Sequence, residues 1–404
     1  MSKIEDLIKQ YCPNGCEWKP LYEVTVWDKR FNSVERYKQP AVIDYKKYFL
    51  GEEQKRLVSE NGSVKILTTY VSNLYADENS VVDYITDGEI VCIPWGGNAI
   101  VQYYKGKFVT GDNRIATSLD VNVLSNKYLY YMMQCNLHLI ASFYRGSGIK
   151  HPDMSKVLDI LIPVPSRPVQ DEIVRILDRF TELEKELEKE LELRRKQYEF
   201  YRDELLTFGD DVERIATKDL VESKFWLMPA TPSYVDSGVR YITSKNIKNG
   251  KIDFSTASFI SKEDYEELSK NRYVKTGDLL ITMIGTIGEC AFVEDETEFY
   301  GQNLYLVRLD DSKINCRYYK YYFEKSKSSL IAKKNDSSQG YLKAGSIDGL
   351  IIPVPSPTEQ QRIVKILDKF DTLTTSLTSG LPAEIKLRKQ QYEYYRDYLF
   401  GLLN

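Results

Sequence analysis

The sequence predicts a mixed α/β (α+β) protein with two domains, each followed by a long helix, and the two helices pair antiparallel as a coiled coil. Three observations support this fold class. The chain carries a long internal repeat, each half ends in an apolar stripe of helical spacing, and strand-like and helix-like segments alternate before each stripe. The implied boundaries are 1–157 and 209–346 for the domains, and 158–208 and 347–404 for the helical segments.

The repeat is clearest at the end of each half. The stretch LDILIPVPSRPVQDEIVRILDRF, ending at Phe180, returns 190 positions later as DGLIIPVPSPTEQQRIVKILDKF, ending at Phe370. The stretch LRRKQYEFYRDELL from Leu193 returns 194 positions later as LRKQQYEYYRDYLF from Leu387, so the second copy holds four extra residues. Weaker matches continue upstream to Gly88 and Gly277. The repeated unit is therefore a domain together with its helix.

The first helix is predicted by apolar residues at alternating spacings of four and three, the pattern of a coiled-coil seam. These residues are Val169, Ile173, Ile176, Phe180, Leu183 and Leu187. We expect this helix to span about 39 residues, or roughly 58 Å. In the second copy, the tetrapeptide SPTE at 356–359 predicts a helix start with a capping box. Gly380 and Pro382 predict a break further along that helix, near the four extra residues.

Chain geometry then predicts how the helices pair. An apolar seam on a single helix is unfavourable in water, and the second helix must return along the first. Antiparallel pairing places one domain at each end, with a pseudo-two-fold axis relating the two repeats. Within the domains, strand-like runs such as EIVCIP, DLLITMI and LYLVRL lie beside helical patches such as KEDYEELSK.

Catalytic motifs are missing from the sequence. It has no glycine-rich S-adenosylmethionine loop, no (N/D)PP(Y/F) motif and no GxxxxGK(S/T) phosphate loop. Six scattered cysteines and two histidines do not form a zinc pattern, so we expect no metal. The CPNGC pair, Cys12 and Cys16, would allow a disulfide across a turn, but free thiols are favoured in a reducing cytosol. We expect no enzymatic activity, and a soluble cytoplasmic protein without a membrane span.

The net charge of −4 is unusual for a protein that binds nucleic acid, because lysine and arginine contacts to phosphate supply most non-specific affinity. Residues 168–208 hold 12 acidic and 8 basic side chains, which accounts for the whole of this charge, since the other 363 residues sum to zero. Any binding surface must therefore be a local patch.

Three pairs of matched, glycine-flanked polar loops are candidates for such a patch. Segment 95–98 (WGGN) corresponds to 283–286 (MIGT), 111–114 (GDNR) to 301–303 (GQN), and 144–151 to 333–340. The tract SKNIKNGKI adds three lysines. Arginine, asparagine and glutamine can read guanine and adenine bidentately, and lysines contact phosphate. The candidate DNA-binding residues are Asn98, Asn113, Arg114, Arg145, Lys150, Lys245, Lys248, Lys251, Thr286, Gln302, Asn303, Lys333, Lys334 and Gln339. A tight hairpin whose polar residues satisfy only their own turn is the alternative for each.

These paired segments, IPVPS followed by QxxIVxILDxF and RKQYEYYRD, with GDLLITMIGTIG at 277–288, resemble the specificity subunit of type I restriction-modification systems. The resemblance covers the whole chain and is strongest over 158–208 and 347–402. The first domain departs from the pattern, with PWGGN where the second has TMIGT. The resemblance implies two target-recognition domains that read an asymmetric bipartite site in double-stranded DNA, with the helices setting the spacing.

The resemblance also implies partners. Two adenine-N6 methyltransferase subunits and motor-nuclease subunits would carry S-adenosylmethionine and ATP with magnesium, and this chain would carry no cofactor. Aromatic and arginine side chains near the helix ends are candidates for methyltransferase docking, with packing between the helices as the alternative. They are Tyr198, Tyr201, Arg202, Tyr392, Tyr395 and Arg396. An autonomous bipartite DNA-binding scaffold or regulator is the other functional class left open, and it would bind DNA specifically without partners.

Overall fold

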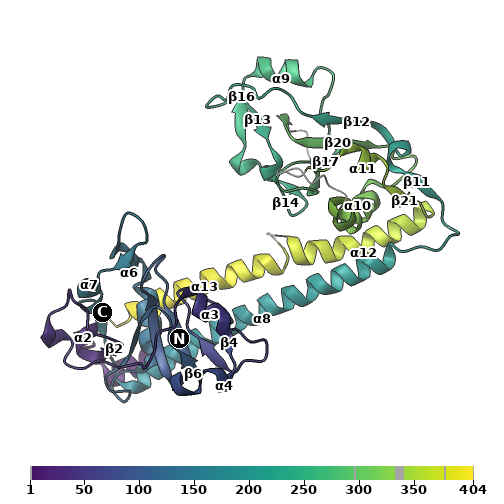
Figure 1. The fold of residues 1–404 in the computed structure, drawn as a ribbon. Coiled ribbons are helices and arrows are strands. Elements are labelled where there is room, and N and C mark those ends of the chain that lie inside the picture. The colour runs from purple at the N-terminus through teal and green to yellow at the C-terminus, as the bar shows by residue number, and fades with distance from the viewer. Residues whose placement is uncertain (1, 295–296, 333–340, 377–378, 404) are drawn as a thin grey trace. The chain divides into compact units, whose positions relative to one another are not determined.

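The computed structural model describes residues 2–294, 297–332, 341–376 and 379–403, and the chain divides into two compact units (Figure 1). Unit 1 comprises Met1–Glu186 and Lys386–Asn404, and unit 2 comprises Leu187–Ile385. Each unit therefore combines one domain with parts of the helices that follow both domains. Mixed helices and strands make up both, as the sequence predicts.

A six-stranded sheet forms the centre of unit 1 among the described residues. Its order is β2 (Thr25–Trp27), β7 (Asn113–Ser118), β5 (Thr86–Pro94), β6 (Gln102–Val109), β3 (Val64–Ile66) and β4 (Tyr75–Ala76). All neighbours are antiparallel except β3 and β6, which run parallel. One face packs on α5 (Asn126–Cys135) and on the apolar side of the first long helix, where Val169, Ile173 and Leu177 are buried.

Shorter elements complete unit 1. They are α1 (Ser2–Tyr11), β1 (Trp18–Pro20), α2 (Leu21–Val24), α3 (Gly51–Leu57), α4 (Glu78–Val81), α6 (Leu137–Ser142), β8 (Tyr144–Arg145), β9 (His151–Pro152), α7 (Met154–Leu158) and β10 (Leu161–Pro163). Strand β10 carries the first IPVPS motif and pairs antiparallel with β1.

Unit 2 is built on two larger sheets. The first has the order β12 (Val221–Leu227), β20 (Leu304–Leu309), β17 (Leu279–Thr282) and β18 (Cys290–Phe292), and the second has the order β16 (Ser258–Ile260), β13 (Val239–Ile242) and β19 (Phe299–Gly301). The remaining elements are β11 (Arg214–Ala216), β14 (Ile247–Lys248), β15 (Lys251–Ile252), α9 (Lys262–Ser269), α10 (Cys316–Ala332), α11 (Ala344–Asp348) and β21 (Ile351–Pro353). Strand β21 carries the second IPVPS motif and pairs antiparallel with β11, as β10 does with β1.

The two units share one strand order. The central strand β17 pairs antiparallel with β18 and β20, as β5 does with β6 and β7. Strand β13 runs parallel to β19 and antiparallel to β16, as β3 does to β6 and β4. Strands β18 and β19 together therefore occupy the place of β6. This equivalence extends the repeat upstream of Gly88 and Gly277, where the sequence shows no match.

Hydrogen bonds at the junction of domain and helix repeat as well. The hydroxyl of Tyr128 donates to the carbonyl of Pro163 at 2.9 Å, and the hydroxyl of Tyr318, 190 positions later, donates to Pro353 at 2.9 Å. The side-chain oxygen of Gln170 accepts from the backbone N–H of Ser125 at 2.9 Å, and that of Gln360 accepts from Asn315 at 2.8 Å. Because these bonds tie α5 to β10 and to the long helix after it in unit 1, and α10 to β21 and to the helix after it in unit 2, each domain holds the start of its own helix in the same way.

The first long helix, α8 (Arg167–Leu205), has the predicted 39 residues. The second helical segment is broken, as predicted, into α12 (Pro357–Thr375) and α13 (Leu381–Gly401). Half of the predicted capping box forms. The hydroxyl of Ser356 accepts from the backbone N–H of Glu359, whereas the carboxylate of Glu359 binds the guanidinium of Arg362 at 2.7 and 2.8 Å instead.

Aromatic stacking joins the helices within each unit. In unit 1, Phe180 of α8 stacks on Tyr395 of α13 with ring centroids 5.2 Å apart. In unit 2, Tyr201 of α8 stacks on Phe370 of α12 at 5.6 Å. Phe180 and Phe370 are repeat equivalents, and so are Tyr201 and Tyr395. The predicted pairing of the helical segments is therefore present in each unit, with the roles of the two repeats exchanged.

In the part of the chain that the structure describes, no helix is long and apolar enough to cross a membrane. The same residues contain no group of three or more histidine, cysteine, aspartate or glutamate side chains placed to hold a metal ion. All six cysteines are free thiols. Burial and the neighbouring Cys12 raise the pKa of the Cys16 thiol to about 12, so Cys16 is not a reactive thiolate.

Candidate nucleic-acid interface

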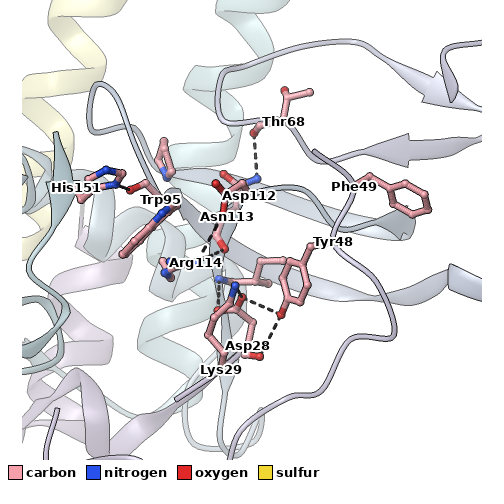
Figure 2. A network of polar contacts seen from close by, with 12 residues as sticks. Asp28, Lys29, Tyr48, Phe49, Thr68, Trp95, Asp112, Asn113, Arg114 and His151 are labelled. Atoms are coloured by element: carbon pink, nitrogen blue, oxygen red, sulfur yellow. Dashed lines mark hydrogen bonds and ion pairs between the residues drawn. The ribbon is translucent and has the colours of Figure 1, made fainter. Parts of the chain in front are cut away.

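Two of the predicted loops in unit 1 pack against each other. The backbone N–H of Gly97 donates to the carbonyl of Lys150 at 2.9 Å, and the Nδ1 atom of His151 is 2.7 Å from the carbonyl oxygen of Trp95. The rings of Trp95 and His151 lie 4.7 Å apart (Figure 2). Loops 95–98 and 145–151 therefore form one surface, on which the side chains of Asn98, Arg145 and Lys150 are exposed.

Asn113 and Arg114 lie beneath this surface. Asn113 is fully buried and its amide Nδ2 donates to the carbonyl of Thr68 at 3.1 Å. The guanidinium of Arg114 is 3.7 Å from the ring centroid of Trp95 and is 5% exposed (Figure 2). Asn113 Oδ1 and Arg114 Nε have no hydrogen-bond partner among the described residues. In this conformation the two side chains support the loops, and reading a base would require Trp95 to move.

A buried carboxylate forms the floor of the same network. Asp28 accepts a hydrogen bond from the backbone N–H of Ile115 at 3.0 Å and from the hydroxyl of Tyr48 at 3.0 Å. Burial raises the pKa of Asp28, while the bond from Ile115 and the nearby charges of Lys29 and Arg114 oppose this rise. Burial and the neighbouring Asp28 raise the pKa of the Tyr48 hydroxyl, which therefore stays protonated as a donor. Asp28 and Tyr48 were not predicted, because they lie far upstream of the loops and no motif marks them.

In unit 2 the loop at 283–289 meets the lysine tract. The side chain of Thr286 is exposed, and its hydroxyl donates a hydrogen bond to the carbonyl of Ser244 at 3.0 Å. Strands β14 and β15 form a hairpin whose turn residues, Asn249 and Gly250, have φ values of 51° and 75°, as a two-residue hairpin turn requires. The hairpin and the turn before it display Lys245, Lys248 and Lys251, which are exposed and make no ion pair with any described residue.

The GDN and GQN segments are close-packed turns. A methyl group on Gly111 would lie 1.9 Å from the carbonyl oxygen of Leu67, and one on Gly301 would lie 2.9 Å from that of Ile242. Only glycine permits this approach of two strands. Gln302 Oε1 accepts from the hydroxyl of Tyr241 at 3.0 Å, and Asn303 has a φ of 64°. Lys333, Lys334 and Gln339 lie outside the described residues.

Comparison with known proteins shows the family to which this chain belongs. The family described as the type I restriction modification DNA specificity domain matches residues 45–193 and 200–387. The EcoR124I/EcoR124II specificity subunit of Escherichia coli is 34% identical over 307 residues, 71% of this chain and 74% of that protein. This chain belongs to the type I restriction-modification specificity family.

Two further comparisons agree. A putative type I restriction enzyme specificity subunit of Haemophilus influenzae is 31% identical over 414 residues, and the match covers 95% of each chain. The crystal structure of the S subunit from M. genitalium has a TM-score of 0.56 at 16% identity, covers 96% of both chains and shows the same fold. The assignment to the specificity subunits, rather than to the enzymes of such systems, is confirmed by these relatives.

The residues predicted for partner docking in this specificity subunit are largely engaged within it. Tyr201 and Tyr395 form the stacks between helices described above, so helix packing, the alternative left open, accounts for one face of each ring. The hydroxyl of Tyr198 donates to Glu324 at 3.2 Å, and Tyr392 packs on the core of unit 1. Arg202 and Arg396 bind the adjacent carboxylates Asp203 and Asp397.

Other apolar side chains on these helices are exposed at matched repeat positions. Phe200 on α8 and its equivalent Tyr394 on α13 are each 64% exposed. Leu193 and its equivalent Leu387 are 53% and 58% exposed. The members of each helix are seven residues apart and share a helix face. A comparison of the two repeats could have found these positions, because both carry a large apolar residue where the seam pattern does not require one.

Proposed function

We propose that this chain reads a bipartite, asymmetric DNA site for a type I restriction-modification enzyme, with one half-site read by each unit. The observation that carries the proposal is the gathering of exposed polar loops at the same place on two copies of one strand arrangement. Loop 95–98 in unit 1 and loop 283–289 in unit 2 follow the equivalent strands β5 and β17, and each packs against a second polar segment, 145–151 in unit 1 and 244–251 in unit 2. Since the loop sequences differ between the units, the two half-sites differ as well.

The local charge supports this proposal. Arg145 and Lys150 are exposed in unit 1 and make no ion pair within the part of the chain that the structure describes. In unit 2 the three lysines of the hairpin region are likewise exposed and make no ion pair with any described residue. Unpaired cations beside polar loops fit a phosphate backbone that positions the protein while the loops contact base edges. The net charge of −4 resides elsewhere, on the helical segment.

The repeat also supports a proposal for the protein partners of this chain. Two adenine-N6 methyltransferase subunits would dock on the helices, one on the face formed by Leu193 and Phe200 and one on the face formed by Leu387 and Tyr394. Equal surfaces on two repeats fit two copies of one partner. Motor-nuclease subunits would complete the restriction enzyme. S-adenosylmethionine, and ATP with magnesium, would be bound by these partners and not by this chain.

The lysine hairpin supplies the test of DNA reading. In the complex with the methyltransferase subunits, the double variant Lys245→Ala/Lys248→Ala should weaken binding to the target duplex and reduce the slope of log affinity against log salt by up to about two units. Fluorescence anisotropy across a salt series measures this slope. Sequencing of methylated sites should show weaker methylation with an unchanged first half-site.

The matched control is Lys218→Ala/Lys270→Ala, which removes two exposed lysines of the same unit away from these loops. An equal loss of slope in both variants would assign the effect to general charge and remove the hairpin from the interface. Specific binding by the chain alone, at the affinity of the complex, would favour the autonomous DNA-binding protein instead.

The docking faces are tested by stoichiometry. Phe200→Ala should weaken one methyltransferase site by about tenfold or more, the effect of removing an exposed aromatic anchor. Native mass spectrometry near the dissociation constant should then detect complexes with one methyltransferase subunit where the unaltered chain binds two. Phe200→Ala/Tyr394→Ala should weaken both sites. The control is Leu119→Ala, which removes a similarly exposed apolar side chain from unit 1. If Leu119→Ala weakened methyltransferase binding as much as Phe200→Ala, the proposed faces would be contradicted.

A further inference from the structure

The two units carry one topologically equivalent loop with opposite chemistry. Strand β3 is parallel to the end of β6, with Ile66 paired to Val109, and β13 is parallel to β19, with Arg240 paired to Phe299. Val109 and Phe299 are 190 positions apart, the spacing of the repeat. The chain segments that leave β3 and β13, residues 67–74 and 243–257, therefore begin at equivalent places of the sheet.

In unit 2 this loop displays Lys245, Lys248 and Lys251. In unit 1 its sequence is LTTYVSNL, without a charged residue, and its tip exposes two apolar side chains. Tyr70 is 57% exposed and Val71 is 77% exposed. Exposed apolar side chains of this kind are unfavourable in water, and this loop leaves the strand equivalent to the one that precedes the proposed phosphate-binding lysines.

Hydrogen bonds hold the base of the apolar loop in place. The hydroxyl of Thr68 donates to the carbonyl of Tyr70 at 2.5 Å and lies 2.8 Å from the hydroxyl of Ser72. The ammonium of Lys65 donates to the carbonyl of Ser72, and burial lowers the pKa of Lys65. The carbonyl of Thr68 accepts from Gln102 at 2.9 Å, and from the buried Asn113 (Figure 2). The tip is thus pre-organised, so binding would lose little conformational entropy.

The bond between Thr68 and Asn113 also places the loop beside the network that supports Trp95 and His151. That network carries the loops of Asn98, Arg145 and Lys150. An apolar tip beside unpaired cations is complementary to a nucleic-acid groove, where phosphates flank the apolar surface of base pairs and the methyl groups of thymine.

We infer that Tyr70 and Val71 contact the apolar surface of base pairs in the half-site of unit 1, and that the same loop of unit 2 binds phosphate through lysines. This inference rests on the proposed function and adds the chemistry of each half-site. Binding through unit 1 at this loop releases no counterions, whereas binding through the lysine loop does. The two loops therefore contribute differently to the salt dependence of one complex.

The experiment uses the full chain with its methyltransferase subunits and a duplex of the target sequence identified by methylation sequencing. Tyr70→Ala/Val71→Ala should lower affinity by about tenfold or more and leave the slope of log affinity against log salt unchanged. Lys245→Ala/Lys248→Ala should reduce that slope. Tyr70→Phe keeps the ring and should keep the affinity of the unaltered complex.

The control is Val82→Ala, which removes apolar surface that is 64% exposed elsewhere in unit 1. An affinity of Tyr70→Ala/Val71→Ala within twofold of this control would overturn the inference, as would a reduced salt slope or a loss of affinity in Tyr70→Phe. Circular dichroism of the variant checks its fold. If the unaltered complex shows no sequence preference, the proposed function itself fails, and that outcome is visible before any variant is made.

Discussion

Replacing Asp278 by alanine is expected to lower the free energy of unfolding of unit 2 by about 3 to 5 kcal/mol, the cost of leaving a buried partner charge uncompensated. The carboxylate of Asp278 is fully buried and binds the guanidinium of Arg308 through two bonds of 2.7 and 2.8 Å. It also accepts from the backbone N–H of Lys275 at 2.8 Å. Alanine would leave Arg308, a residue of β20, charged and buried without its carboxylate partner.

Hydrogen–deuterium exchange measures this effect for one unit at a time. Peptides of β17 and β20 should lose protection, while those of β5 and β7 in unit 1 serve as an internal reference. Lys262→Ala, which removes an exposed ion pair with Glu298, should leave the protection of β17 and β20 unchanged, because water and salt screen exposed pairs. Asp278→Leu/Arg308→Met, which replaces both buried charges, should recover part of the loss. Equal protection in Asp278→Ala and Lys262→Ala would show that the pair does not stabilise the unit.

Inserting Glu-Leu-Glu-Lys after Lys189 is expected to change the spacer of the recognised DNA site and leave both half-sites unchanged. Helix α8 is continuous from Arg167 to Leu205, and its residues belong to unit 1 up to Glu186 and to unit 2 from Leu187. Four residues add roughly 6 Å and about 40° of net rotation to the helix. At about 3.4 Å per base pair, the insertion corresponds to at most about two base pairs.

Sequencing of methylated sites in cells that carry the variant gives the outcome directly. The break between α12 and α13, near Gly380, allows the second helical segment to follow the longer first one. The unaltered chain, in which residues 186–189 already read Glu-Leu-Glu-Lys, serves as the reference. New half-sites with the old spacer would show that the helices do not set the distance.

Much of the architecture follows from the sequence, because it depends on local patterns. The repeat, the 39 residues of α8 and the break near Gly380 are all set by apolar spacing or by backbone-restricted residues. The capping of α12 was predicted only in part, since Glu359 had a nearby alternative partner in Arg362. The equivalence of β3 and β13 was not predictable. Strands pair through backbone hydrogen bonds, so the two strands can occupy equivalent places in the sheets although their side chains differ.

The candidate site was predicted less completely. The loops were located in the sequence by their glycines. The three lysines of the hairpin region were predicted to lie at the surface, and they are exposed. Burial of Asn113 and Arg114 was not predictable, because it depends on Trp95 covering them and on Thr68 binding the amide, both contacts between distant segments. Tyr70 and Val71 gave no signal, since an apolar pair in a sequence resembles a short strand.

The exchange of aromatic partners between repeats has a consequence for the origin of this chain. Phe180 and Tyr395 stack in unit 1, and Tyr201 and Phe370 stack in unit 2, so each of these two stacks takes one ring from each repeat. A shorter ancestor with one repeat would hold both rings, but about 31 Å apart on one continuous helix, too far to stack on one another. Two such molecules would complete both contacts by pairing antiparallel about a two-fold axis. Gene duplication and fusion would then turn this homodimer into one polypeptide and free each half to acquire a different DNA target.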